Sequence, residues 1–328
     1  MFALKHVDIG YREKNSDVIL FEKLNLSIGA GEMVCLMGPN GIGKSTLIRS
    51  VAHLQPLIKG EVWLHDEPLH NANPEQIASC LSLVLTEKVN TLNIKTEEMI
   101  GYGRYPYLNW KLAFSDEDYT IINKAIQQTH IEHLKGKKMY ELSDGQAQLV
   151  MIARALVQDG DVILLDEPTA HLDLNNRVEI MNLLKTLARQ TGKAILVATH
   201  ELDLALQTAD TIWLAGLDKT IKTGAPEDLV LDGSIDEVFK FKGYDLKTGK
   251  VFHKPERNIS IAVQGSGHTL LWTKNALERC GYAVDSSGTA TIEIIQKESQ
   301  ITWILKLNEQ TTSFTQLEHL LKSLNELQ

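Results

Sequence analysis

The stretch MVCLMGPNGIGKSTLIRSVAHL, residues 33–54, is the most informative segment of the chain. Its first five residues are an apolar run of the kind found in buried parallel strands. The next nine, Gly38–Thr46, fit the pattern GxxxxGK[ST], and a helical pattern follows them. This order predicts a phosphate-binding loop, in which backbone N–H groups turn inward and the helix N-terminus adds positive potential. A glycine-rich turn that matches by chance is the alternative.

Within this loop, two side chains have expected roles. Lys44 would reach the β- and γ-phosphates of a nucleotide, and the Ser45 hydroxyl would bind Mg²⁺. The residues expected to contact the nucleotide are Gly38, Pro39, Asn40, Gly41, Ile42, Gly43, Lys44, Ser45 and Thr46.

Two further apolar runs end in polar residues. DVILLDEP (161–168) is closed by Asp166 and Glu167, and KAILVATH (193–200) ends at His200. A carboxylate at the first position can hold the hydration shell of Mg²⁺, and Glu167 can polarise the attacking water. The alternative is a solvated strand end. His200 stands where ligands gather in open α/β sheets, at the carboxyl end of a strand.

Length and composition restrict the possibilities. The 328 residues suggest two domains at about 100–200 residues each, and 43% apolar content is enough for a core. The net charge of −9 disfavours a nucleic-acid partner. The three cysteines, Cys35, Cys80 and Cys280, lie far apart and form neither the pattern of a disulfide framework nor a CxxC pair, which fits a reducing compartment. We find neither a signal peptide nor a run of about 18 apolar residues that would cross a membrane.

Strands alternate with helices up to about residue 250, which favours a mostly parallel sheet with helices around it. Residues 97–160 have a mostly helical pattern. From 255 to 328 the order of strands and helices changes to βαβββα or similar, which indicates a separate small α+β domain. Trp272, Leu277 and Trp303 are its expected core residues.

LSDGQ, Leu142–Gln146, precedes another helical pattern, and Ser143 is an N-cap candidate there. Together these elements resemble the nucleotide-binding subunit of ATP-binding cassette (ABC) transporters over about residues 1–250. The resemblance implies an α/β fold: a P-loop NTPase domain with a RecA-like core and a helical subdomain at about 88–160. The α+β domain would have a regulatory or dimer-stabilising role.

The resemblance also implies roles for individual residues. Gly38–Thr46 resembles Walker A, and Asp166-Glu167 resembles Walker B with the catalytic glutamate. Catalysis would depend on Glu167, His200 and Lys44, and Tyr11 would stack on adenine, although a tyrosine after a strand is otherwise unremarkable. The implied D-loop residue is Asp173, and the implied Mg²⁺ ligands are Ser45, Glu87 and Asp166. The signature residues, which act on the ATP of a second subunit, are Ser143, Asp144, Gly145 and Gln146.

Two positions depart from the family pattern. Asp144 stands where glycine is usual, and because a carboxylate repels phosphate we expect it to face outward. The segment LSLVLTEKV (81–89) resembles a family strand that ends in glutamine, but Glu87 stands there. It would offer a charged oxygen to Mg²⁺, or it is a plain surface acid.

GRYPY, Gly103–Tyr107, resembles the GRxPH stretch of importers for iron–siderophore complexes, haem and cobalamin. The alternative interpretation is an ordinary loop with a proline turn. The resemblance implies a homodimer that sandwiches ATP with Mg²⁺, two membrane permease subunits, and indirectly a substrate-binding protein. The chain would lie at the cytoplasmic face of the inner (plasma) membrane, without nucleic acid. An ABC exporter subunit and a soluble ABC ATPase without a transport role are the alternatives.

Overall fold

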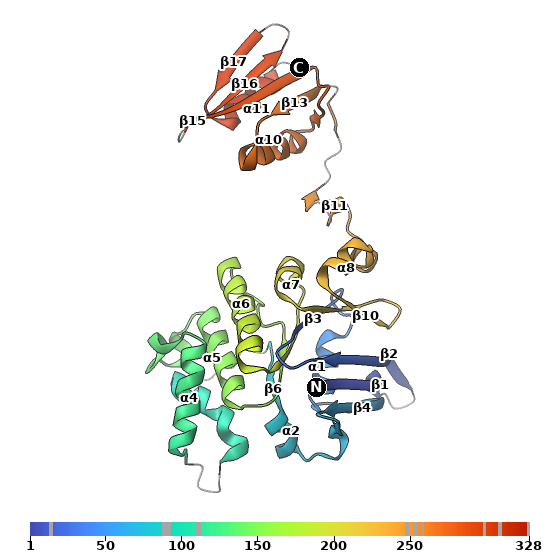
Figure 1. Cartoon of the computed structure of the whole chain (residues 1–328), viewed down its shortest axis with the longest axis vertical. Coiled ribbons are helices and arrows are strands. Elements are labelled where there is room, and N and C mark those ends of the chain that lie inside the picture. Colours follow the sequence, from blue (N-terminus) through green and yellow to red (C-terminus); the bar gives the residue numbers. More distant parts are fainter. Residues whose placement is uncertain are drawn as a thin grey trace. The chain divides into compact units, whose positions relative to one another are not determined.

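The computed structural model describes residues 1–12, 16–86, 93–108, 113–246, 249–251, 255–257, 259–297, 300–307 and 310–326. It divides into two compact units, Met1–Lys240 and Phe241–Gln328, which we describe separately (Figure 1). The sequence pattern changes at about residue 250, whereas the first unit of the structure already ends at Lys240. The short hairpin of β11 (Tyr244–Asp245) and β12 (Lys250–Val251) therefore belongs to the second unit.

A six-stranded sheet forms the centre of the first unit, in the order β10-β9-β3-β8-β7-β6. Five strands are parallel, and β10 pairs antiparallel with β9. Every residue of β3, β7 and β8 is buried, as expected for parallel strands covered on both faces. The strands are β3 (Met33–Met37), β6 (Leu81–Val84), β7 (Val162–Asp166), β8 (Ala194–Ala198), β9 (Thr211–Ala215) and β10 (Ile221–Gly224).

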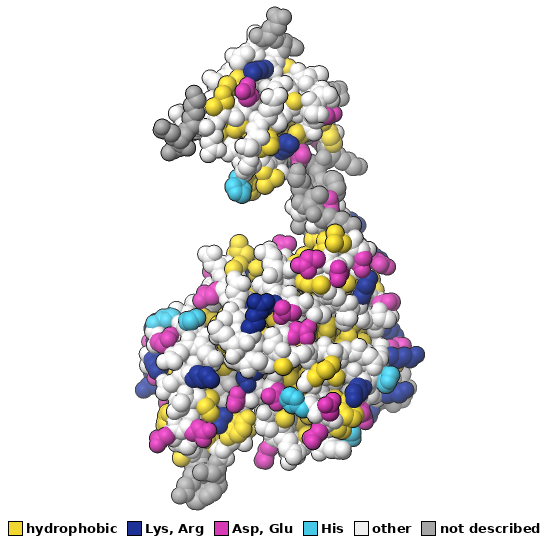
Figure 2. Space-filling model, viewed as in Figure 1, with side chains coloured by type: hydrophobic (Ala, Val, Ile, Leu, Met, Phe, Trp, Pro, Cys, Tyr) yellow, Lys and Arg dark blue, Asp and Glu magenta, His cyan; other side chains and the backbone are white. Residues whose placement is uncertain are grey.

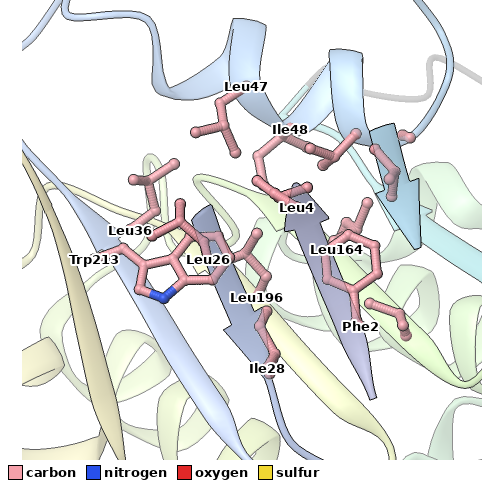
Figure 3. Close-up of a cluster of buried hydrophobic side chains, with 14 of the residues drawn as sticks. Phe2, Leu4, Leu26, Ile28, Leu36, Leu47, Ile48, Leu164, Leu196 and Trp213 are labelled. Atoms are coloured by element: carbon pink, nitrogen blue, oxygen red, sulfur yellow. The ribbon is translucent and has the colours of Figure 1, made fainter. Parts of the chain in front are cut away.

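An antiparallel sheet packs against the parallel one. Its order is β2-β1-β4-β5, with β1 (Phe2–Arg12), β2 (Asp17–Ile28), β4 (Lys59–Leu64) and β5 (Glu67–Pro68). Figure 3 shows side chains of both sheets meeting in one cluster with those of α1 (Lys44–Val51). This packing holds α1, and therefore the loop before it, between the two sheets. The labelled members are Phe2, Leu4, Leu26, Ile28, Leu36, Leu47, Ile48, Leu164, Leu196 and Trp213.

Helices make up the remainder of the first unit. α3, α4 and α5 pack against one another in the green part of Figure 1. α6 and α7 contact β3, and α6 also contacts β8. The helices are α2 (Pro74–Cys80), α3 (Thr96–Gly101), α4 (Asp116–Gln128), α5 (Asp144–Val157), α6 (Leu174–Thr191), α7 (Leu202–Thr208), α8 (Pro226–Leu231) and α9 (Ser234–Phe239), with the 3₁₀ turns η1 (Leu69–Asn71), η2 (Tyr102–Tyr107), η3 (Glu132–Leu134) and η4 (Met139–Glu141).

The GRYPY stretch is the 3₁₀ turn η2, which is fixed by its arginine. Arg104 is 8% exposed. Its Nε donates to Asp118 Oδ1 over 2.7 Å, and another guanidinium nitrogen donates to the Val157 carbonyl over 3.2 Å. A Cβ at Gly103 would lie 2.2 Å from the Arg154 carbonyl oxygen, so only glycine allows this approach. Arg104 therefore ties η2 to α4 and to the end of α5.

The second unit is an α+β domain, as the sequence predicts. Its sheet has the order β14-β13-β15-β16-β17. Phe314 ends β17, and α11 begins at Leu317. The elements are β13 (Ser260–Gln264), α10 (Gly267–Arg279), β14 (Ala283–Val284), β15 (Ala290–Lys297), β16 (Gln300–Leu307), β17 (Gln310–Phe314) and α11 (Leu317–Glu326).

The prediction that Trp272 belongs to the core of this domain is wrong. Trp272 is 67% exposed, whereas Leu277 and Trp303 are buried as expected. The buried positions of α10 are Thr273, Ala276 and Leu277, and their spacing of three and four residues defines one helix face. Trp272 lies outside this face of α10, and its side chain is therefore exposed.

No helix in the described part of the chain combines the length and the apolarity needed to cross a bilayer. On the face in view in Figure 2, acidic and basic side chains of the first unit are interspersed with apolar ones. That face therefore carries no continuous basic band.

We predict that Arg104→Ala destabilises the first unit. Burial acts to raise the pKa of Asp118, but hydrogen bonds from Ser115 and Arg104 outweigh it and hold this pKa below its usual value. Loss of the guanidinium strands a buried carboxylate and should lower the free energy of unfolding by about 3 kcal/mol at pH 7. Urea unfolding followed by circular dichroism measures this. The exposed pair Lys322–Glu318 is the control: Lys322→Ala should leave the midpoint unchanged. An unchanged urea midpoint in Arg104→Ala would show that Arg104 does not stabilise the first unit through Asp118.

Candidate active site

The candidate site lies at the carboxyl ends of the parallel strands. β3 lies beside β8, and β8 beside β7, so the loops that follow these three strands meet at one edge. Gly38–Thr46 follows β3, Asp166 ends β7, and His200 follows β8. The Thr199 N–H donates to the Leu36 carbonyl over 3.1 Å, which holds the start of the loop after β8 beside the end of β3.

Backbone conformation explains two glycines of the phosphate-binding loop. Gly41 has φ +80° and no atom within 4 Å of a Cβ built there, so the conformation requires glycine and the space beside it is open. Gly43 has φ +113°, and its Cβ would lie 2.9 Å from Leu20 Cδ1. The Nζ of Lys44 donates to the Gly38 carbonyl over 3.0 Å. The ammonium group is therefore folded back over the loop.

Lys44 is a buried cation. Its side chain is 7% exposed, and its Nζ lies 3.9 Å from Glu167 Oε1. Burial lowers the pKa of Lys44, while the carboxylates of Glu167 and Asp166 act in the opposite direction. A buried charge is costly unless it is paired. A phosphate over the loop would supply the close anionic partner that Glu167, at this distance, does not.

Asp166 and Ser45 form the candidate metal site. Ser45 Oγ donates to Asp166 Oδ1 over 2.9 Å, and Asp166 is 4% exposed. Burial raises the pKa of Asp166, and the hydrogen bond from Ser45 acts against this. A hydroxyl and a carboxylate are both oxygen ligands of the kind that Mg²⁺ prefers, so this donor pair fits the metal.

Thr86 connects a fourth strand end to this site. Its Oγ1 donates to the Asp166 carbonyl over 2.7 Å, two residues after β6 ends at Val84. The next residue is Glu87, which lies outside the described residues. Its predicted contact with Mg²⁺ therefore stays a prediction.

Glu167 and His200 form a close pair. Glu167 Oε2 lies 2.6 Å from His200 Nδ1. Glu167 has φ +50°, a left-handed conformation that is unfavourable for its residue type and typical of functional positions. Its N–H donates to the Ala198 carbonyl over 2.8 Å, which fixes the turn to β8. The structure thus brings Lys44, Glu167 and His200 into one row, and their catalytic roles stay a prediction.

Tyr11 stands beside the phosphate-binding loop. Its hydroxyl lies 2.6 Å from Thr46 Oγ1, and the residue is 48% exposed at the end of β1. The hydrogen bond places an accessible aromatic ring next to the loop. Stacking on adenine fits this placement and stays a prediction.

The signature residues lie at the start of α5. Ser143 and Gln146 form a capping box, with bonds of 3.3 Å and 3.1 Å between each backbone N–H and the other side chain. Asp144 is exposed in the first turn of α5. Among the described residues, no hydrogen bond or ion pair joins Ser143, Gly145 or Gln146 to Gly38–Thr46.

The predicted D-loop residue lies near the predicted signature. Asp173 caps α6 by accepting from the Asn176 N–H over 2.9 Å. A Cβ at Gly145 would lie 2.8 Å from Asn176 Cγ, so the buried glycine allows the Asn176 side chain of α6 to pack closely on α5. The two motifs therefore share one corner of the fold.

Sequence reasoning missed several residues of this site. Thr86, Asn176 and Arg177 carry no motif, and only the folded chain shows their contacts. Glu201 did have a signal, because it is an acid next to His200.

Comparison with known proteins extends this description. Residues 21–170 match the family described as "ABC transporter", and 258–325 match "Iron ABC transporter C-terminal domain". An ABC transporter ATP-binding protein of Methanocaldococcus jannaschii, MJ0873, is 36% identical over 274 residues, 82% of this chain and 93% of its own. The chain belongs to the ABC transporter family. It is an ATPase cassette of that family, which confirms the resemblance and the fold class.

Other ABC relatives carry transport names. The achromobactin transport ATP-binding protein CbrD of Dickeya dadantii is 34% identical, covering 72% of this chain and 86% of its own. The iron(3+)-hydroxamate import ATP-binding protein FhuC of Bacillus subtilis is 31% identical, covering 73% and 87%. Among solved structures, the dimeric ABC transporter cassette MJ0796 has a TM-score of 0.59 and 27% identity, covering 69% of this chain and 99% of its own.

We predict that Lys44→Ala weakens ATP binding by this ABC cassette. Loss of the buried cation removes charge-assisted bonds to phosphate, so the Kd for ATP should rise roughly 10- to 100-fold. Isothermal titration calorimetry measures it. Lys193→Ala is the matched control, because Lys193 precedes β8 at the opposite edge of the same sheet and is also largely buried. An unchanged Kd in Lys44→Ala would remove Lys44 from the site.

Proposed function

We propose that this chain is the ATP-hydrolysing subunit of an importer for metal chelates of the iron–siderophore, haem or cobalamin type. A separate permease would form the path across the membrane, with this chain bound peripherally at its cytoplasmic face. The observation that carries the ATPase part is the position of Glu167, between the Lys44 ammonium group and the His200 ring. The transport names of CbrD and FhuC support the cargo class.

The site chemistry follows from the geometry. The γ-phosphate would lie over the loop, where Lys44 compensates its charge. Glu167 would accept the proton of the attacking water while the bond from the γ-phosphorus to the leaving ADP oxygen breaks, and His200 would hold the carboxylate in place. Ser45 and Asp166 would hold Mg²⁺, which supplies charge neutralisation at the phosphates.

A second copy of the chain would complete each site. The Ser143 hydroxyl and the N–H groups at the start of α5 would form an anion-binding group, and within the described part of the chain no hydrogen bond joins Ser143 to the phosphate-binding loop. Two chains in head-to-tail arrangement would each place this group on the other's γ-phosphate. The cassette MJ0796 forms a dimer, which supports the pairing of two chains.

We predict that Glu167→Gln keeps ATP binding and loses turnover. The amide cannot accept the proton, so kcat should fall about 10²- to 10⁴-fold, and the ATP-bound dimer should accumulate. Phosphate release and light scattering with ATP measure the two effects. Glu179→Gln, at an exposed position of α6, is the control. Normal turnover in Glu167→Gln would refute the assigned base.

An uptake experiment in cells tests which cargo is transported. In a strain that lacks the chain, iron–siderophore, haem and cobalamin are offered side by side. Loss of one cargo, restored by the native protein and not by Glu167→Gln, is the expected outcome. Uptake of all three at the native rate would contradict the proposed import function.

The proposed permease contact is a cavity of about 580 Å³ in the first unit. The end of α1, α2, β6, η2 and α5 line it, so it joins the central sheet to the helical elements. Leu54 and Tyr105 at this cavity are 60% and 52% exposed. Apolar side chains this accessible suit a short helix from the permease. Pro106 of the GRYPY stretch also lines the cavity, which supports the metal-chelate class.

We predict that Leu54→Glu abolishes uptake and co-purification with the permease. A carboxylate in the cavity opposes burial of a partner helix, whereas the nucleotide site is untouched, so the affinity of the isolated chain for ATP should not change. Leu217→Glu is the matched control, because Leu217 is 65% exposed and lines a different cavity. Normal uptake in Leu54→Glu would remove the cavity from the permease interface.

A further inference from the structure

Arg177, in the first turn of α6, joins two loops of the site. Its Nε donates to the Leu172 carbonyl over 2.6 Å, within the segment before Asp173. Another guanidinium nitrogen donates to Glu201 Oε1 over 2.7 Å. The side chains of Arg177 and Glu201 are 33% and 16% exposed. One planar guanidinium thus holds the D-loop and the loop after β8 at once.

The same Glu201 oxygen reaches the catalytic pair. Oε1 lies 3.4 Å from His200 Nε2, while His200 Nδ1 lies 2.6 Å from Glu167 Oε2. Both ring nitrogens of His200 therefore face a carboxylate oxygen. The Glu201 N–H also donates to Thr199 Oγ1 over 3.0 Å, which holds the glutamate beside the ring. This arrangement fixes the rotation of a ring whose side chain is 48% exposed.

We propose that Arg177 and Glu201 are positioning residues that link the D-loop to the His200–Glu167 pair. The proposal rests on the proposed function, in which Glu167 is the base and a second copy closes on the signature. Closure would press on the corner shared by the signature and the D-loop. Arg177 would carry that displacement through Glu201 to His200.

Two adjacent residues of α6 contact the signature on one side and the loop after β8 on the other. The backbone of Asn176 bonds Asp173 and its side chain packs on Gly145, whereas Arg177 bonds Leu172 and Glu201. A shift of this turn therefore moves both contacts together. A purely structural ion pair would hold α6 to β8 without affecting the rate of the chemical step.

The test is ATP hydrolysis by the full chain carrying Arg177→Lys or Glu201→Gln. A lysine cannot hold both acceptors in the fork geometry, and a glutamine loses the charge beside His200. We expect kcat to fall roughly 10- to 100-fold, with KM for ATP and the melting temperature nearly unchanged. Glu201→Asp should recover most of the rate. The double variant should lose little more than either single one.

Cooperativity gives the second readout. If Arg177 transmits dimer closure, the Hill coefficient for ATP should fall toward one in Arg177→Lys. The matched control is Lys185→Gln, because Lys185 also joins α6 to the sheet, through an ion pair with Asp210. It should leave kcat and the Hill coefficient unchanged.

Two results would overturn the proposal. One is native kcat and cooperativity in Arg177→Lys, and the other is an equal loss of both in Lys185→Gln. If Glu167→Gln is inactive while Arg177→Lys is normal, only the positioning role fails. If Glu167→Gln itself keeps its turnover, the proposed function fails and the positioning role fails with it.

Discussion

The buried charge of Lys44 is the constraint on which the site depends. Its side chain is 7% exposed, its ammonium group donates to the Gly38 carbonyl, and Glu167 lies 3.9 Å away. The Gly38 carbonyl and the Glu167 carboxylate compensate only part of this charge. The loop is therefore a strong site for an anion. Burial lowers the pKa of Lys44, and the carboxylates of Glu167 and Asp166 only oppose this shift, so the ammonium group gains from an anion bound beside it.

Such a site needs a rigid base, and the two sheets provide it. β3 and α1, on either side of the loop, are buried in the cluster that joins the parallel and antiparallel sheets (Figure 3). The order β3-β8-β7 then places three loops at one edge, and short bonds between loops fix their distances. The geometry around Lys44 is therefore a consequence of core packing.

Features that depend on residues close in sequence could be predicted, whereas contacts between residues far apart in sequence could not. Gly38–Thr46 and the apolar strands were predictable, because glycine spacing and apolar runs act locally. The Arg104–Asp118 tie and the Arg177–Glu201 pair were not, since each joins elements that only the fold brings together. Trp272 was misassigned because its type suggests a core residue, whereas the register of α10 determines its exposure.

The first turn of α6 gathers these contacts. Asn176 packs beside Gly145 of the predicted signature, and Arg177 faces the loop that carries His200. Two neighbouring residues on a helix point in directions about 100° apart, so one turn can contact both motifs. Because α6 packs on β3 and β8, this turn is anchored to the strands that carry the phosphate-binding loop and His200. A displacement at the signature would pass by side-chain packing to the first turn of α6, and from Arg177 by ion pairs and hydrogen bonds to the Glu167 carboxylate.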